Sequence, residues 1–450
     1  MSRFIPVDRD TIYLLPPSVQ DWLGKDHLAR FVVETVEQLD LGPLERAYAG
    51  RGSDAYHPAM LLGLLIYGYA TGVFSSRAIE RATYDSVAFR YVAANTHPDH
   101  DTINVFRQRF LKQIGPLFVQ VLLIAREMGV LKLGHVALDG TKVHANASKH
   151  SALSWGHANK IEAQLKAEVA QLLRLGAQAD QAEIPDGMSL PKELELREKR
   201  LQAIAEAKQR IAERAAQRQA IEQADYEAKC QAREAKRQAG KPPRGPEPQP
   251  PVQGPKDPDQ VNLTDPDSRI MKATGKGFEQ AYNAQAAVDT ATMLVVGEHL
   301  TQAPNDKQQI EPMIERLDAL PEALGEIEGL SADTGYASAH NVACCEAAEI
   351  TPYIATGKEL HHPPLLARFC EPTPLAPEAD ALTRMQHRLA TQAGKAVYAQ
   401  RKSTVEPVFG IIKHVMGFRQ FMLRGLEKVQ GEWTLVCMAW NMKRLCVLAG

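Results

Sequence analysis

The sequence predicts a mixed α/β protein with an all-helical N-terminal region and a helical insertion. Three observations predict this fold class. Apolar residues recur at helical spacing between positions 28 and 110, whereas strand-like and helix-like segments alternate between positions 282 and 356. A long stretch rich in Ala, Gln, Glu, Lys and Arg interrupts the chain before that alternation begins. The 450 residues suffice for about two to four domains of ordinary size.

The charge balance limits how the chain can bind nucleic acid. It has 52 Lys and Arg against 54 Asp and Glu, so its net charge is -2. A protein that binds DNA over much of its surface would be strongly basic. Any DNA-binding surface must therefore be a local patch.

Two features predict an intracellular protein without a membrane segment. Met1–Asp10 carries charges but lacks the apolar core of a secretory signal. The most membrane-like stretch, Ala59–Phe74, has 16 residues including three Gly, whereas a spanning helix needs about 20 apolar residues. We expect a buried helix there. The six cysteines include no Cys-x-x-Cys pair, so we expect reduced, structural thiols.

The helical region over residues 1–128 is the predicted DNA-binding domain. Turn signals at Gly72 and at His97-Pro98-Asp99 divide it into separate helices. Two of these helices, Ser76–Thr83 and Thr102–Phe110, carry arginines and suit a helix-turn-helix element. The arginines are Arg77, Arg81, Arg107 and Arg109. The alternative is that they form only a solvated face.

Residues 158–259 are predicted to leave the α/β fold as a helical hairpin or short coiled coil followed by a linker. Two helical stretches are separated by a break at 184–187. Their apolar seam is interrupted by Arg197, Lys208 and Arg218, which argues against a long autonomous coiled coil. Positions 240–259 contain eight prolines in twenty residues, a composition that predicts a semi-rigid or disordered connector.

On either side of this insertion, the pattern predicts a mixed sheet. Val136–Leu138 is a buried strand that leads into Asp139, with the acid at or near its end. After the insertion, strands and helices alternate, and the chain from Thr391 onward is helical again. The predicted strands lie at 282–288, 293–296, 328–332 and 352–356, with helices at 308–320 and 337–348.

Three acids are the candidates for catalysis. Asp139 and Asp333 each follow a short apolar segment, so two acids at adjacent strand ends would be able to share a metal. Singly, either aspartate also fits a turn or a helix cap, which remains the alternative. Glu406 directly precedes Pro407, which suits the first turn of a helix.

A local basic patch surrounds the third acid. Between Lys395 and Lys428 there are seven Lys or Arg and two Glu, Glu406 and Glu427. Acids that hold cations, set among basic residues that hold a phosphate backbone, are what a DNA-cleaving metal site requires.

Four motifs resemble those of DDE transposases from bacterial insertion sequences, and they occur in that family's order. The N-terminal stretch 97–109 is similar to the family's N-terminal region, so the resemblance covers nearly all the chain except about 151–259. The four motifs are Asp139-Gly140-Thr141-Lys142, Tyr282-Asn283-Ala284-Gln285, Ala332-Asp333-Thr334-Gly335-Tyr336 and Val405-Glu406-Pro407-Val408-Phe409-Gly410-Ile411-Ile412-Lys413.

The resemblance implies an RNase H-like catalytic domain made of residues 129–157 and 260–450. Asp139 would lie on its first strand, Asp333 on its fourth and Glu406 on a later helix, together holding two Mg²⁺ ions, with Mn²⁺ as a substitute. One departure concerns the residues before Glu406. Family members often have Tyr and Arg at set intervals there, but Arg401 leaves four intervening residues instead of three, and Lys402 has the usual spacing.

The implied activity is cleavage and strand transfer of double-stranded DNA, both the transposon ends and the target, by a bacterial cytoplasmic protein that associates with the nucleoid. A homodimer is expected on the DNA. The alternatives are an RNase H-like nuclease without strand transfer and an inactive DNA-binding or coiled-coil scaffold. The candidate DNA contacts are Arg77, Arg107, Arg109, Lys142, Arg401, Lys402, Lys413, Arg419 and Arg424.

Overall fold

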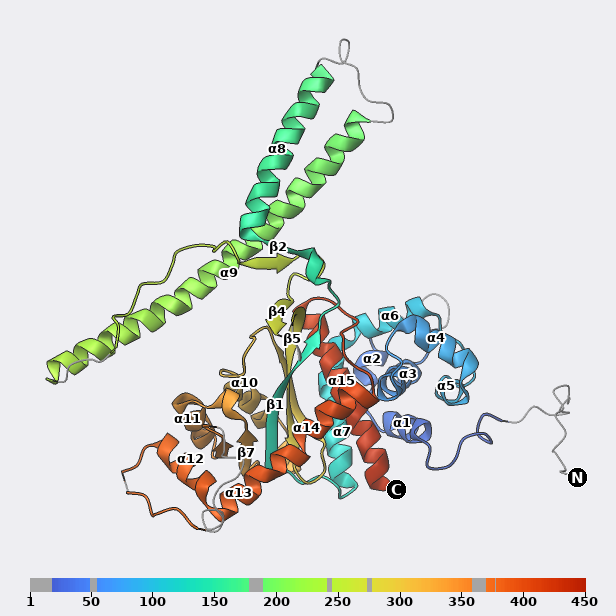
Figure 1. The fold of residues 1–450 in the computed structure, drawn as a ribbon. Helices are drawn as coiled ribbons and strands as arrows, with labels where there is room; N and C mark the ends of the chain where they lie inside the picture. Colours follow the sequence, from blue (N-terminus) through green and yellow to red (C-terminus); the bar gives the residue numbers. More distant parts are fainter. Residues whose placement is uncertain are drawn as a thin grey trace, which may run out of the picture. The chain divides into compact units, whose positions relative to one another are not determined.

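The computed structural model describes residues 18–48, 55–177, 189–240, 245–272, 277–357, 370–376 and 378–450. The chain divides into two compact units (Figure 1). The first unit comprises Met1–Ala145 and Ala281–Gly450, and the second comprises Asn146–Gln280. The break predicted at 184–187 lies outside the described residues.

The first unit begins with helices, as the apolar spacing predicts. Asp99 caps the helix that follows it, because its side chain accepts a 2.8 Å hydrogen bond from the backbone nitrogen of Thr102. Gly72, with φ of +86°, ends the helix Pro58–Thr71, as the turn signal at this glycine predicts. These helices are α1 (Leu28–Glu37), α2 (Gly42–Glu45), α3 (Pro58–Thr71), α4 (Ser76–Asp85), α5 (Val87–Val92), α6 (His100–Arg109) and α7 (Leu111–Glu127).

Helix α3 is buried on nearly every side, which agrees with the buried helix expected at this apolar stretch. No single helix among the described residues combines the length and apolar character needed to cross a bilayer; α3 and α4 pass that test only as a pair bent by 93°.

A mixed sheet forms the centre of the first unit. Strands β5, β1, β7 and β8 pair in that order, and β6 also pairs with β5; β1 is antiparallel to β5 and parallel to β7, and β8 is parallel to β7. This confirms the mixed α/β class. The strands are β1 (His135–His144), β5 (Phe278–Asp289), β6 (Val295–Thr301), β7 (Gly329–Ala332) and β8 (Thr351–Ile354).

Strand β1 is longer than the apolar run predicts. The prediction that Asp139 lies at or near the strand's end is wrong, because β1 continues to His144. Residues 140–144 stay in the sheet by pairing with β5, whose partners run from Gln285 to Ala281. Pairing with β7, by contrast, stops at Ala137. Asp139 therefore lies where β1 still pairs with β5 but no longer pairs with β7.

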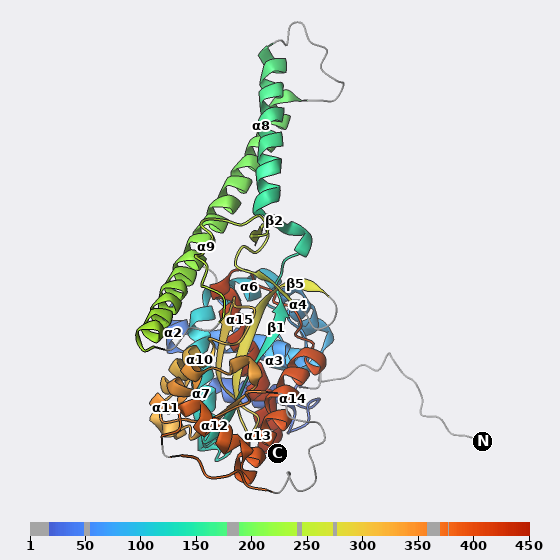
Figure 2. The ribbon, with the colours of Figure 1, turned by 60° about the vertical axis from the view of Figure 1, so that its left-hand side comes forward.

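The remaining helices cover the sheet. They are α10 (Ile310–Asp318), α11 (Ala339–Ala347), α12 (Ala381–Ala390), α13 (Gln392–Ala399), α14 (Val405–Gly410) and α15 (Leu426–Ala449). Helix α15 packs against β6 and against α3 and α7, so it joins the sheet to the N-terminal helices (Figure 2). The Trp433 indole donates a 3.0 Å hydrogen bond to the carbonyl of Gln285, and Asn441 bonds both backbone groups of Val295.

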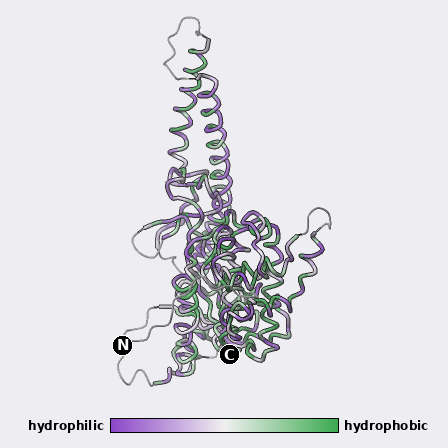
Figure 3. Tube along the Cα trace, turned by 90° about the vertical axis from the view of Figure 1, so that its right-hand side faces the viewer, coloured by the Kyte–Doolittle hydropathy of each residue, from purple (hydrophilic) through white to green (hydrophobic). Residues whose placement is uncertain are grey.

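The second unit contains the predicted helical hairpin. Helices α8 (Trp155–Ala177) and α9 (Leu190–Gln238) pack on a small apolar core that includes Leu165, Ile204 and Ile211. Outside this core their residues are mostly hydrophilic (Figure 3). A short sheet that the sequence did not predict pairs β2 (Ala152–Ser154) with β3 (Gln260–Asn262), and β4 (Arg269–Lys272) follows.

The charged residues in the apolar seam cross-link the hairpin. Lys208 lies 2.6 Å from Glu162 and Arg197 lies 2.7 Å from Glu168, each pair joining the two helices. Arg218 instead reaches out of the hairpin, to Asp259 at 2.7 Å. These contacts explain how the seam tolerates charge.

The described part of the proline-rich segment is held against α9, which favours the semi-rigid connector over the disordered one. Arg233 donates hydrogen bonds to the carbonyls of Gly245 and Pro246, and Arg218 donates to the carbonyl of Gly254. These three carbonyls lie outside helices and strands, so they are available to arginine donors. The composition predicted the absence of a core but not these arginine contacts.

Candidate active site

Asp139 on β1 and Asp333, which directly follows β7, lie at the same offset from a paired position of these two parallel strands. Ala137 of β1 pairs with Ser331 of β7, and each aspartate lies two residues further along its chain. Since side chains alternate along a strand, an offset of two brings both carboxylates to one face of the sheet edge. β7 is the fourth sheet strand of the described first unit in chain order.

Each aspartate uses one oxygen to fix its own turn. Oδ1 of Asp139 accepts a 2.8 Å hydrogen bond from the backbone nitrogen of Gly140. Oδ1 of Asp333 accepts a 2.8 Å bond from the backbone nitrogen of Gly335 and caps the short helical turn η3 (Thr334–Tyr336). The second oxygen of each carboxylate is left for another partner.

Arg401 links Asp139 to the third acid. Its Nη1 lies 3.2 Å from Oδ2 of Asp139 and its Nη2 lies 2.9 Å from Oε1 of Glu406. Arg401 comes from the turn η5 (Gln400–Ser403), and Glu406 from the first turn of α14, as Pro407 predicts. The arginine side chain is only 10% exposed, so it is a buried counter-charge.

The electrostatics of Asp139 favour a bound cation. Burial raises the pKa of its carboxyl to about 6, opposed by the Gly140 hydrogen bond and by Arg401, and reinforced by Asp333 and Asp306. Arg401 alone thus does not offset the free-energy cost of burying the Asp139 carboxylate near other acids. Carboxylate oxygens are the ligands that Mg²⁺ prefers, so the residues present fit a hard divalent cation.

Asp306 is a site residue that the sequence did not predict. Its Oδ1 accepts hydrogen bonds of 2.6 Å from Asn283 and 2.7 Å from Gln285, two residues of the β5 motif. Lys142 of β1 lies 3.8 Å from the same oxygen. Asp306 lies in a loop between β6 and α10, where no strand or helix pattern marks it.

Two of the predicted basic residues lie beside the acids. The Lys413 ammonium donates a 2.7 Å hydrogen bond to the carbonyl of Lys142, and Lys142 faces Asp306. Burial lowers the pKa of both amines, and the proximity of Lys142 lowers that of Lys413 further. With Arg401, they bring three of the predicted DNA contacts to the site.

The other predicted contacts lie elsewhere. The side chain of Arg109 stacks on Tyr48 and Phe110. Arg107 is 5% exposed and donates hydrogen bonds to the Tyr69 hydroxyl and the Phe74 carbonyl, so its burial favours a structural role over a DNA contact. Arg109 is exposed, as are Arg77, Lys402, Arg419 and Arg424.

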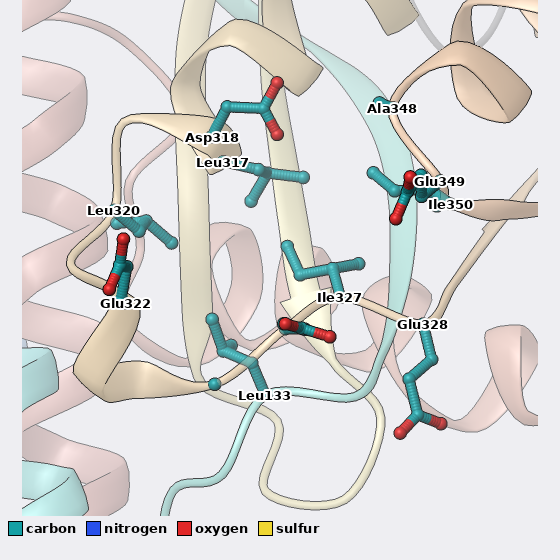
Figure 4. A pocket seen from close by; sticks show the side chains of 12 residues that line it. Leu133, Leu317, Asp318, Leu320, Glu322, Ile327, Glu328, Ala348, Glu349 and Ile350 are labelled. Atoms are coloured by element: carbon teal, nitrogen blue, oxygen red, sulfur yellow. The ribbon is translucent and has the colours of Figure 1, made fainter.

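A pocket of about 720 Å³ lies away from these acids (Figure 4). Its lining includes Leu133, Glu328 and Ile350, which lie one or two residues before the strands β1, β7 and β8. The pocket is therefore at the amino ends of these strands, whereas Asp333 follows the carboxyl end of β7. It has no part in the candidate active site.

Two family models match the chain. The Transposase domain (DUF772) matches residues 17–109, and the Transposase DDE domain matches residues 373–446. No curated protein and no solved structure matches the chain significantly. The second match includes Arg401, Glu406 and Lys413, which the fold brings to the two aspartates. Both matches support the same assignment, a DDE-type transposase of an insertion sequence.

Proposed function

We propose that this transposase binds the terminal inverted repeats of its element and cuts and joins DNA at an RNase H-like site formed by Asp139, Asp333 and Glu406. The observation that carries the proposal is the register of the two aspartates. They are 194 residues apart in the chain, yet each lies two residues after the paired Ala137 and Ser331 of adjacent strands. Glu406 joins them through Arg401.

The three acids would hold two Mg²⁺ ions, for which Mn²⁺ can substitute. Such a metal pair activates water or a DNA 3′-hydroxyl and stabilises the leaving oxygen of an in-line displacement. Arg401 balances the charge of the acids, and its planar guanidinium suits phosphate as well as carboxylate. Lys142 and Lys413 supply positive charge next to the acids, where the backbone of the scissile strand has to lie.

Recognition of the DNA ends is assigned to the N-terminal helices. Arg77 on α4 is exposed, and α4 packs against α6, an arrangement compatible with a helix-turn-helix element. The exposed Lys402, Arg419 and Arg424 would contact phosphates. We further propose that two copies assemble on the DNA, because an element has two ends to be joined, and that DNA binding places the protein at the nucleoid.

The test is a cleavage and joining assay on DNA that carries the element's own ends. Asp139→Asn, Asp333→Asn and Glu406→Gln should each abolish Mg²⁺-dependent cleavage and retain end binding, since an amide keeps the shape but loses the charge. Asp318→Asn, at the distant pocket, is the control. Full cleavage by any of the three would remove that acid from the site.

The same assay separates the alternatives. A nuclease without strand transfer would cut the ends but would not join a 3′-hydroxyl donor to target DNA. An inactive scaffold would bind the ends and do neither. Joined products that require all three acids would support transposition.

A further inference from the structure

The surroundings of Asp306 explain two glycines in the aspartate motifs. A Cβ atom added at Gly140 would lie 2.6 Å from Oδ1 of Asp306, a distance that forces a shift. A Cβ atom at Gly335 would lie 2.9 Å from Oδ1 of Asp333 and 3.7 Å from Oδ2 of Asp306. The Asp306 carboxylate therefore lies between the turn of Asp139 and the turn of Asp333.

The two oxygens of Asp306 differ in what they contact. Oδ1 is fixed by the amides of Asn283 and Gln285 and faces the Lys142 ammonium. Oδ2 has no hydrogen-bond partner within the described part of the chain, and it is the oxygen that approaches Gly335. A carboxylate that is 22% exposed and fixed through one oxygen presents the other in a defined position.

A second observation beside Asp306 points to a ligand. The side chain of Asn283 is fully buried, and its Oδ1 has no hydrogen-bond donor among the residues that the structure describes. Its amide nitrogen donates to Ala303 and Asp306, which fixes the orientation of the group. The unpaired oxygen lies 3.0 Å from the Cβ position of Gly140, next to Asp139. A buried acceptor without a donor is costly unless an absent group supplies one.

We propose that Asp306 is a fourth carboxylate of the acid site and that its Oδ2 is a ligand of a divalent cation held with Asp333. The inference rests on the proposed function, because it adds a ligand to the same site. Mg²⁺ usually keeps several bound waters, and such waters are hydrogen-bond donors of the kind that Oδ1 of Asn283 lacks. Asn283 and Gln285 are then positioning residues, which fix Asp306 and contact no metal.

The experiment measures Mn²⁺ binding to the full chain without DNA, so it does not depend on activity. We compare wild type with Asp139→Asn, Asp306→Asn and the distant control Asp318→Asn. An asparagine at 306 can still accept from both amides, so the fold should be retained. Asp306→Asn should weaken Mn²⁺ binding at least ~10-fold, the lower limit for losing even an outer-shell partner. Asp318→Asn should bind as wild type does.

The outcomes separate this inference from the proposed function. Weak binding by Asp139→Asn with wild-type binding by Asp306→Asn would overturn the fourth ligand and leave the three-acid site intact. Wild-type binding by Asp139→Asn would contradict both, because the acids would not be the Mn²⁺ site.

A second variant distinguishes a ligand from a residue that only supports the fold. Asp306→Cys replaces a hard oxygen ligand by a soft thiolate, so Mn²⁺ binding should weaken while Cd²⁺ binding becomes tighter than that of wild type. Asp318→Cys controls for a thiol at an unrelated acid. If Asp306→Cys binds Cd²⁺ no more tightly than Asp318→Cys does, residue 306 is not a direct metal ligand.

Discussion

Arg401 donates a hydrogen bond of 3.2 Å to Asp139, one of the two aspartates aligned on neighbouring parallel strands. The same guanidinium holds Glu406, so one buried cation balances the charge of two of the candidate catalytic acids. An arginine in this position stabilises the site before any metal is bound. Its spacing from Glu406 departs from the family pattern by one residue, but the turn η5 still directs it inward.

Removal of Arg401 should therefore destabilise the metal-free protein. Arg401→Ala leaves the carboxylates without their counter-charge, and we expect a loss of about 2–4 kcal/mol in the free energy of unfolding in EDTA. Saturating Mg²⁺ should restore part of that loss. Denaturant unfolding with and without Mg²⁺ measures both. Lys402→Ala, at the exposed neighbour, is the control, and equal stability of the two variants in EDTA would refute the counter-charge role.

Substitutions of Arg107 and Arg77 should affect different properties: Arg107→Ala should lower stability, and Arg77→Ala should weaken DNA binding. Arg107→Ala removes a buried guanidinium that bonds Tyr69 and Phe74, and should cost about 2–3 kcal/mol of stability. Arg77→Ala should leave the melting temperature unchanged, weaken end binding, and lower the salt slope of binding by about 1 if it contacts a phosphate. Thermal unfolding and a salt titration of end binding test the pair. Unchanged stability of Arg107→Ala would show that its hydrogen bonds are dispensable.

His135 should make stability depend on pH. Burial lowers the pKa of its imidazole to about 4 from its ordinary value of 6.5, and Nε2 of the ring lies 2.7 Å from the Ser331 hydroxyl. The folded state thus binds fewer protons than the unfolded state between these values. The contribution of His135 is fully present above about pH 6.5 and is lost as the pH falls through about 4, a change of up to ~3 kcal/mol.

His135→Gln should flatten this part of the pH profile, because glutamine does not titrate. Urea unfolding at intervals between pH 7 and pH 4 gives the two curves. His144→Gln, at the exposed end of the same strand, should retain the wild-type slope. Parallel curves for His135→Gln and wild type would mean that other groups set the acid sensitivity.

The inserted hairpin should be removable. Ser154 of β2 pairs with Gln260 of β3, so a two-residue Asn-Gly turn has the right geometry to replace Trp155–Asp259. The shortened protein should unfold cooperatively and bind Mn²⁺ as the full chain does. Leu153 and Val261 lose their helix contacts, so each is changed to Thr in this variant. Insoluble protein, or loss of Mn²⁺ binding, would mean that the first unit depends on the insertion.

Sequence patterns predicted those parts of the fold that depend on local periodicity. The N-terminal helices, the strand and helix order after 282, and the hairpin all have apolar spacing that only one element type satisfies. Asp139, Asp333 and Glu406 could be predicted as candidate site residues because motif order accompanied the spacing. The length of β1 was not predicted, because polar residues 140–144 pair with a strand that is distant in the sequence.

Contacts between distant segments account for what the sequence did not predict. Asp306 lies in a loop, and its partners on β5 are about twenty residues away. Glu432 is buried in α15 and accepts hydrogen bonds from Tyr69 and from the backbone of Met422 and Leu423, partners that the local sequence does not indicate. Arg107 has the same helical context as Arg109 but faces the core. Only the assembled fold distinguishes such positions.

The equal offset of the two aspartates restricts how the gene can change in length. One codon gained between Ala137 and Asp139 would turn that carboxylate to the opposite face of the sheet, since side chains alternate in twos. The number of residues between the two aspartates is not restricted in this way, because the inserted chain leaves and returns through the paired strands β2 and β3. Relatives should therefore differ widely in the number of residues that separate their two aspartates, while both two-residue offsets stay unchanged.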